Sequence, residues 1–234
     1  AHARPGVLQG LKEGLVYTFG FPPVRSILML VGVVSFTTMP LSVLMPIVAD
    51  KVMGGGAQTL GYLTSAQGLG ALSGALYLAS RRTVLGLGKR IALGATCVGL
   101  GMTAFSWMTN FWLSCLVLAL IGCAMMVQMA ASNTIVQTIV DSDKRGRVMS
   151  LYATAFMGMA PLGSLAAGAL AARIGAEPTL RLCGACSLFG GLLFASQLPR
   201  LRVLIRPIYI RAGILPEIAG GVEVASELTS PRRG

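Results

Sequence analysis

The sequence predicts an all-α integral membrane protein with six transmembrane helices, and three observations support this prediction. Hydrophobic residues make up 54% of the 234 residues and charged residues only 12%, about half the share of roughly 25% in soluble domains. The mean hydropathy is +0.74. The apolar residues form six segments long enough to cross a bilayer as helices, with the basic residues clustered between them.

Each apolar segment is expected to form a helix, because a helix satisfies its own backbone hydrogen bonds in hydrocarbon. A short amphipathic helix is predicted on the cytoplasmic membrane surface before them, where apolar residues recur at helical spacing ahead of Pro22. The chain thus divides into a cytoplasmic segment (1–25), a six-helix bundle (26–198) and a cytoplasmic tail (199–234). The predicted spans are residues 26–49, 60–80, 90–108, 112–137, 148–172 and 180–198.

Basic residues determine the expected orientation, because cytoplasmic loops of membrane proteins carry an excess of lysine and arginine. With the N-terminus in the cytoplasm, all of the 19 basic residues except Lys51, Arg173 and Arg181 fall on the cytoplasmic side. Trp107 and Trp112 then lie at the outer interface, where tryptophan rings are favoured. Both termini are therefore expected in the cytoplasm.

The same pattern argues against several classes of function. The formal charge of +11 is spread over short clusters between apolar segments, unlike the basic face of a nucleic-acid-binding protein, so no nucleic-acid partner is expected. Cys183 and Cys186 form a CxxC pair without a nearby histidine or second pair, and no metal site or cofactor is predicted. The single histidine is His2, and the acids lie at segment ends, in loops or in the tail. A membrane-embedded enzyme is therefore not expected.

Residues 145–170, RGRVMSLYATAFMGMAPLGSLAAGAL, combine a spanning length with glycines and a proline that weaken a helix in water. Small residues let membrane helices approach closely, which favours their association. Pro161 removes one backbone hydrogen bond and is expected to bend the helix. Two ridges of small residues predict contacts with neighbouring helices: Ala160, Ser164, Gly168 and Ala172, and beside them Gly163, Ala167 and Ala171.

A short internal similarity predicts an inverted three-plus-three repeat. SGALYLASRR at residues 73–82 and AGALAARIG at residues 167–175 both carry Gly-Ala-Leu followed by arginine at the helix end. The predicted topology puts one arginine end inside and the other outside, as an inverted repeat of three helices requires.

Three segments resemble transporters of the major facilitator superfamily. Residues 145–170 resemble the loop and eleventh helix of the branch that contains the enterobactin exporter and macrolide efflux proteins. RRTVLGLGKR at residues 81–90 resembles the basic cytoplasmic loop of the second half, without its aspartate. GLKEGLVYTFGFPPVRSILML at residues 10–30 resembles the segment that joins the halves. The residues similar to the antiporter motif and its helix-packing positions are Gly158, Pro161, Gly163, Ser164 and Gly168.

The resemblance covers residues 6–200 and implies helices seven to twelve of a twelve-helix transporter, that is, one half of a major facilitator fold. It further implies an N-terminal six-helix half as partner, contacts with membrane lipid, a small-molecule substrate and a place in the bacterial inner membrane.

Uncharged polar residues within the spans are candidates to line a substrate cavity, because such side chains are costly against lipid. The alternative is that each bonds a neighbouring helix, which contributes about 0.6 kcal/mol on average. No span has a charge near its middle, so a proton carrier, if transport is proton-driven, is expected in the N-terminal half. The candidates are Thr37, Thr38, Ser42, Gln67, Gln128 and Asn133.

A second group lies at the predicted cytoplasmic helix ends. Its charged residues are interpreted as a latch that stabilises one state of an alternating cycle. The alternative is a simple topology signal, which any basic loop supplies. The residues are Arg81, Arg82, Asp141, Arg145, Gly146 and Arg147.

The expected function is export of an amphipathic or lipophilic small molecule by alternating access, because the expected cavity wall is apolar and neutral. The alternative is a stand-alone six-helix membrane protein that acts as a homodimer. Six further spans upstream of Ala1 in the gene would favour the half-transporter, and a start codon there would favour the homodimer.

Overall fold

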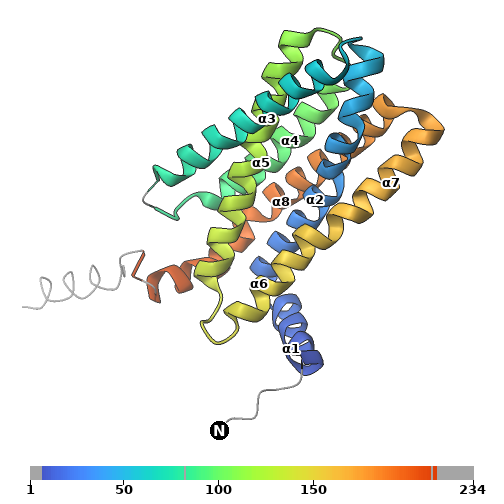
Figure 1. Ribbon diagram of the computed structural model, residues 1–234. Coiled ribbons are helices and arrows are strands. Elements are labelled where there is room, and N and C mark those ends of the chain that lie inside the picture. Colours follow the sequence, from blue (N-terminus) through green and yellow to red (C-terminus); the bar gives the residue numbers. More distant parts are fainter. Residues whose placement is uncertain (1–6, 82, 212, 215–234) are drawn as a thin grey trace, which may run out of the picture.

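The computed structural model describes residues 7–81, 83–211 and 213–214, and every regular element in these ranges is a helix (Figure 1). A short helix precedes six helical rods, two of which contain a π-helical turn. The elements are α1 (Val7–Gly20), α2 (Pro22–Ile47), η1 (Val48–Val52), α3 (Gly56–Ala79), α4 (Leu87–Phe105), α5 (Phe111–Ile139), α6 (Arg145–Ala153), η2 (Thr154–Gly158), α7 (Met159–Ile174) and α8 (Ala176–Arg211).

Four rods in the described ranges are long and apolar enough to cross a membrane: Pro22–Val52, Phe111–Ile139, Arg145–Ile174 and Ala176–Arg211. The other two, α3 and α4, form where spans were predicted but are less apolar. α3 contains many glycines and several polar residues, and α4 carries Lys89 and Arg90 in its first turn. The all-helical membrane fold is confirmed, and six crossings stay a prediction.

Several helix boundaries differ from the predicted ones by a few residues or more, and three of the differences bear on the fold. α2 begins at Pro22, because a proline is tolerated in the first turn, where its missing N–H is not needed. α2 also continues past its predicted end as the π-helical turn η1. α8 runs through Pro199 to Arg211, so the domain boundary expected at residues 198–199 lies inside a helix. The amphipathic helix predicted before the bundle forms as α1, and residues 215–234 of the predicted tail lie outside the described residues.

The packing order of the helices follows the predicted inverted repeat. α3 packs on α5, α5 on α4, α4 on α8, α8 on α2, and α2 on α7. The first three rods can be exchanged for the last three, that is, α2 for α5, α3 for α7 and α4 for α8. The exchange gives the same five helix contacts, written in the reverse direction. Counterparts are three rods apart in an up-and-down chain, so they run in opposite directions. α3 and α7 therefore occupy equivalent places at opposite edges of the bundle (Figure 1).

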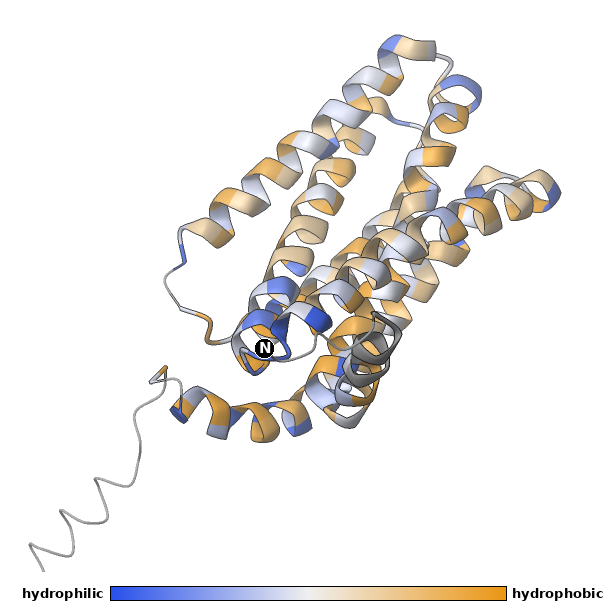
Figure 2. Cartoon of the chain, turned by 60° about the horizontal axis from the view of Figure 1, so that its bottom comes forward, coloured by the Kyte–Doolittle hydropathy of each residue, from blue (hydrophilic) through white to orange (hydrophobic). Residues whose placement is uncertain are grey.

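Apolar residues fill the bundle and also cover its outside. One buried cluster, which includes Val24 and Ile91, lies at the end where α2 begins, and another, which includes Leu41 and Leu118, lies at the opposite end. Leu165 on α7 is nevertheless 72% exposed, and Figure 2 shows apolar residues on outward faces of the long helices. Such faces are expected to contact lipid.

Only one of the two ridges predicted on residues 160–172 contacts a neighbouring helix. A Cβ at Gly163 would overlap the Phe36 carbonyl of α2, and Ala167 is 3% exposed. A Cβ at Gly168 would meet no atom within 4 Å. Gly163 and Gly168 cannot share a contact, because five residues turn a helix by about 140° from its starting side. Within the described chain, Gly168 itself has room for a Cβ, whereas Ala160 and Ser164 of its ridge are half-buried.

Candidate functional site

α2 carries three buried polar side chains with different hydrogen-bonding states. The Thr37 hydroxyl donates to the Val33 carbonyl of its own helix at 2.8 Å. The Ser35 hydroxyl donates to the Phe156 carbonyl of η2. Thr38 is 3% exposed, and its hydroxyl has no hydrogen-bond partner. Thr38 is therefore the candidate on α2 with an unused polar atom, whereas Thr37 is satisfied locally.

The π-helical turn η2 explains why Ser35 bonds to Phe156. In a π-helix a carbonyl accepts from the N–H five residues on, and five residues after Phe156 stands Pro161, which has no N–H. The Ser35 hydroxyl donates to this carbonyl. Sequence reasoning expected an irregularity at Pro161, but Pro161 lies in the first turn of α7, and the irregular turn immediately precedes that helix.

Gln128 on α5 is the second candidate with an unused polar atom. It is 3% exposed, and its Nε2 has no hydrogen-bond partner. A Cβ at Gly94 of α4 would lie 2.7 Å from the Gln128 Cβ, so Gln128 sits in the contact between α4 and α5. A buried amide that lacks a partner costs about 1–3 kcal/mol.

Four uncharged polar residues form an uncovered face near the end of α5, called here the α5 strip: Asn133, Thr134, Gln137 and Thr138. Gln137 donates to the Asn133 side-chain oxygen, and the two threonine hydroxyls bond to carbonyls of their own helix at 2.9 and 2.7 Å. Thr134 and Gln137 are exposed, and the other two are half-buried. Asn133 was predicted as a cavity residue, and Thr134, Gln137 and Thr138 lie one, four and five residues after it on the same helix.

The remaining cavity candidates do not join this strip. Ser42 on α2 is exposed, and Gln67 on α3 is half-buried, with its backbone carbonyl against Gly122 of α5. Within the described chain, no hydrogen bond joins any two of the six predicted cavity residues. The sequence therefore located polar positions on three different helices, and the structure places them in separate surroundings.

The predicted latch residues near α6 contact the short helix α1. The Tyr17 hydroxyl donates to Asp141 Oδ2 at 3.4 Å, and Lys144 Nζ lies 4.7 Å from the centre of the Tyr17 ring. Burial, followed by the negative charge of Asp141, raises the pKa of the Tyr17 phenol. Asp141 and Arg145 form no ion pair in the part of the chain that the structure describes. The latch stays a prediction.

The other residues around α6 have separate surroundings. Arg145 Nη2 lies 3.5 Å from the Val140 carbonyl oxygen, and a Cβ at Gly146 would meet no atom within 4 Å. A Cβ at Gly14 of α1 would lie 3.3 Å from the Arg147 Cβ. The residues before and in α6 therefore support α1 on the bundle.

Tyr77 of α3 organises the other predicted basic group, and sequence reasoning missed it. Arg81 Nη2 and Arg90 Nε each donate to the Tyr77 hydroxyl at 3.2 Å. Both guanidinium groups lie over the ring, with their central carbons 5.3 and 5.9 Å from its centre. Arg82 lies outside the described residues. The sequence signal that could have identified Tyr77 is its position one helical turn before Arg81.

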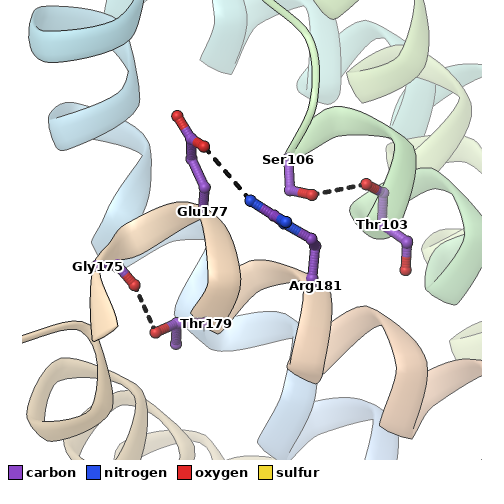
Figure 3. Close-up of polar contacts among 6 residues, drawn as sticks. All are labelled: Thr103, Ser106, Gly175, Glu177, Thr179 and Arg181. Atoms are coloured by element: carbon purple, nitrogen blue, oxygen red, sulfur yellow. Dashed lines mark hydrogen bonds and ion pairs between the residues drawn. The ribbon is translucent and has the colours of Figure 1, made fainter. Parts of the chain in front are cut away.

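The opposite end of the bundle is held by a contact between α4 and α8. Arg181 pairs with Glu177 at 3.5 Å and lies over the Trp107 ring, with 5.5 Å between the guanidinium carbon and the ring centre. Figure 3 shows the Glu177–Arg181 pair of α8 near Thr103 of α4 and Ser106, the residue that follows α4. Arg181 is one of the three basic residues predicted on the outer side.

The packing order and the uncharged polar residues on long apolar helices are typical of membrane transport proteins. The chain belongs to the family of transmembrane secretion effectors of the major facilitator superfamily, which it matches over residues 3–205. The expected family is confirmed. Membership in this family groups the chain with membrane transporters rather than with enzymes.

Two individual proteins illustrate this likeness. The multidrug efflux pump Tap of Mycolicibacterium fortuitum is 28% identical over 200 residues, which are 85% of this chain and 48% of Tap. A crystal structure of a mutant of the peptide transporter POT with alafosfalin superposes with a TM-score of 0.62 at 14% identity, covering 88% of this chain and 46% of POT. The second likeness concerns the fold alone. The chain spans about half the length of the curated relative it matches.

Proposed function

We propose that this chain is the C-terminal half of a major facilitator exporter, which moves an amphipathic or lipophilic small molecule outward by alternating access. The observation that carries this proposal is the uncovered α5 strip. Polar side chains in a spanning helix are costly against lipid and normally face a bundle interior or an aqueous cavity. The strip has neither within the described chain, and a second bundle or a water-filled cavity beside it would supply one.

A second six-helix bundle is the covering that the comparisons favour. Tap and POT are each about twice as long as the matched part of this chain. In transporters built from such halves, the substrate site lies between them near the middle of the membrane.

The chemistry of the described helices supports a neutral, amphipathic cargo. Thr38, Gln128 and the α5 strip offer hydroxyl and amide groups, and no acid or base lies near the middle of a span. A charged solute would need an opposite charge in this low-dielectric region. If the transporter is proton-driven, the titrating carrier lies in the other half.

Accumulation of a neutral lipophilic fluorescent dye such as Nile red tests the proposal in cells that lack or express the full-length gene. Expressing cells should retain less dye. Gln137→Leu should restore much of the retained dye without reducing the amount of folded protein, because it removes an amide from the α5 strip. Gln58→Leu is the matched control, since Gln58 is an exposed glutamine in the first turn of α3. Equal accumulation with and without the gene, across a panel of lipophilic drugs, would contradict the proposal.

A further inference from the structure

We propose that the groove between α4 and α5 binds one anionic glycerophospholipid, with its phosphate at Tyr77, Arg81 and Arg90 and an acyl chain along the groove. The proposed orientation assigns this lipid to the cytoplasmic leaflet. The binding site itself requires neither the transported solute nor the second half of the transporter.

The polar end of the site has hydrogen-bond donors that the protein does not use. Arg81 and Arg90 each place one N–H on the Tyr77 hydroxyl, whereas a guanidinium has five donors. Arg90 Nη1 is buried and has no hydrogen-bond partner. Paired guanidinium groups match phosphate oxygens in geometry and charge. A phosphate at this end would supply the acceptor that Arg90 lacks.

No acidic residue of this part of the chain balances the positive charge. The sequence has no aspartate or glutamate between Asp50 and Asp141, and neither Arg81 nor Arg90 forms an ion pair within the described residues. The N-terminus of α4 adds to the positive potential, since a helix N-terminus carries partial positive charge. Basic sites between membrane helices on the cytoplasmic side bind anionic lipid headgroups.

The rest of the groove has the chemistry of an acyl-chain site. It has a volume of about 610 Å³ and is lined almost entirely by apolar side chains beyond Tyr77 and Arg90. Small residues along the contact of the two helices form the bottom of the groove. Leu93 and Leu120 form its sides and are 67% and 60% exposed. The small residues are Gly94, Cys97, Gly101 and Ala104 on α4, and Cys123 and Ala124 on α5.

The length of the groove agrees with one membrane leaflet. From Arg90 to Ala104 the α4 axis rises by about 21 Å, and one leaflet with its headgroup region is roughly 20–22 Å thick. A basic end and an apolar floor of this length fit a phosphate headgroup with its acyl chain. A protein helix in the groove would present its backbone to the cationic end, but its backbone would not bring the full negative charge of a phosphate.

Native mass spectrometry of the purified protein can test the site with phosphatidylglycerol and phosphatidylethanolamine as probes. Phosphatidylglycerol should bind more tightly. The double variant Arg81→Gln/Arg90→Gln should weaken its binding roughly tenfold or more, because each cation near the surface contributes to anionic-lipid binding. Lys89→Gln is the matched control: it removes one charge from the same region, but Lys89 does not line this groove, and it should change binding by less than about twofold.

Cysteine protection tests the acyl-chain part of the site. Cys97 lines the groove and is exposed, and Cys186 on α8 is exposed elsewhere. Phosphatidylglycerol should slow alkylation of Cys97 by N-ethylmaleimide and leave Cys186 unchanged. Unaltered lipid binding by the double variant, an equal loss in Lys89→Gln, or no protection of Cys97 would each overturn the proposal. These readouts do not involve efflux, so their failure leaves the proposed transport function untouched.

Discussion

Two helix pairs related by the inverted repeat, α3 with α5 and α2 with α7, are held together in different ways. In the first pair, a Cβ at Gly70 would overlap the Ala119 backbone, and one at Gly74 would lie 2.6 Å from the Cys123 carbonyl oxygen. A Cβ at Gly122 of α5 would likewise overlap the Gln67 backbone of α3. In the second pair, Gly163 makes the comparable contact with Phe36, whereas a Cβ at Gly32 would meet the Met159 side chain at 3.7 Å.

The difference indicates which pair can change its arrangement. α3 and α5 are regular α-helices with backbones in contact at three glycines, and such packed contacts resist deformation. α2 contains Pro40 and Pro46, and its partner rod contains the π-helical turn η2, whose Phe156 carbonyl depends on Ser35. We infer that the α3–α5 pair moves as one body and that the α2–α7 pair bends during transport.

Gly70→Leu should have the largest effect on stability, because the α3 and α5 backbones would have to separate. We expect a loss of about 3 kcal/mol in the free energy of unfolding. Gly68→Leu on the same helix is the control, since a Cβ there would meet no atom within 4 Å. Thermal unfolding in detergent measures both, and similar melting temperatures for the two variants would contradict the described contact.

Gly163→Leu should cost less, about 1–2 kcal/mol, because this pair meets at one glycine and its irregular rod can shift. Gly168→Leu is the matched control on α7 and should stay within about 0.5 kcal/mol of the native protein. The same unfolding measurement applies. A loss for Gly163→Leu larger than for Gly70→Leu would reverse the inferred order of rigidity.

Ser35→Ala should destabilise the protein by about 1 kcal/mol, because the Phe156 carbonyl of η2 loses its donor. Ser42→Ala on the same helix removes an exposed hydroxyl and should have little effect. Melting temperatures that fall equally in both variants would show that the contact between Ser35 and η2 does not support the π-helical turn.

Thr38→Val should leave stability unchanged or raise it by up to about 0.5 kcal/mol, because the buried hydroxyl has no partner to lose. Dye efflux should fall if this hydroxyl meets the cargo. Thr37→Val is the neighbouring control, and it should be slightly destabilising, since its hydroxyl bonds to Val33. Full efflux by Thr38→Val would remove Thr38 from the proposed cavity.

The smallest effect is expected at Tyr17. Its raised pKa keeps the phenol protonated and able to donate to Asp141 at neutral pH. The stabilisation by this hydrogen bond is fully present below the unfolded-state tyrosine pKa of about 10. It is lost as the pH rises through the higher folded-state pKa. Tyr17→Phe should cost less than about 0.5 kcal/mol at neutral pH, and the difference should disappear in strongly alkaline buffer. A difference that grows with pH would contradict this account.

The sequence predicted the features that depend on local pattern. Apolar length located the six rods, and the spacing of small residues identified Gly163 as a contact. The similarity between residues 73–82 and 167–175 predicted a repeat that the packing order reproduces. Each of these features requires only the period of a helix and the length of a bilayer.

The remaining features depend on tertiary partners that a linear pattern does not reveal. Thr37 and Thr38 are adjacent and chemically identical, yet only Thr37 finds a carbonyl acceptor. The π-helical turn η2 depends on Ser35, which lies more than a hundred residues earlier. α8 continues through Pro199 because tertiary packing can outweigh the local preference to end a helix at proline.

Hydrogen–deuterium exchange of the protein in lipid nanodiscs tests most directly whether the two related helix pairs differ in mobility. The peptide that covers Thr154–Gly158 should exchange roughly tenfold faster than the peptide that covers Gly70 and Gly74, because local opening is easiest where backbone hydrogen bonds are irregular. Ser35→Ala should widen this difference. Equal exchange rates in the two peptides would contradict the inference that the α2–α7 pair bends while the α3–α5 pair stays rigid.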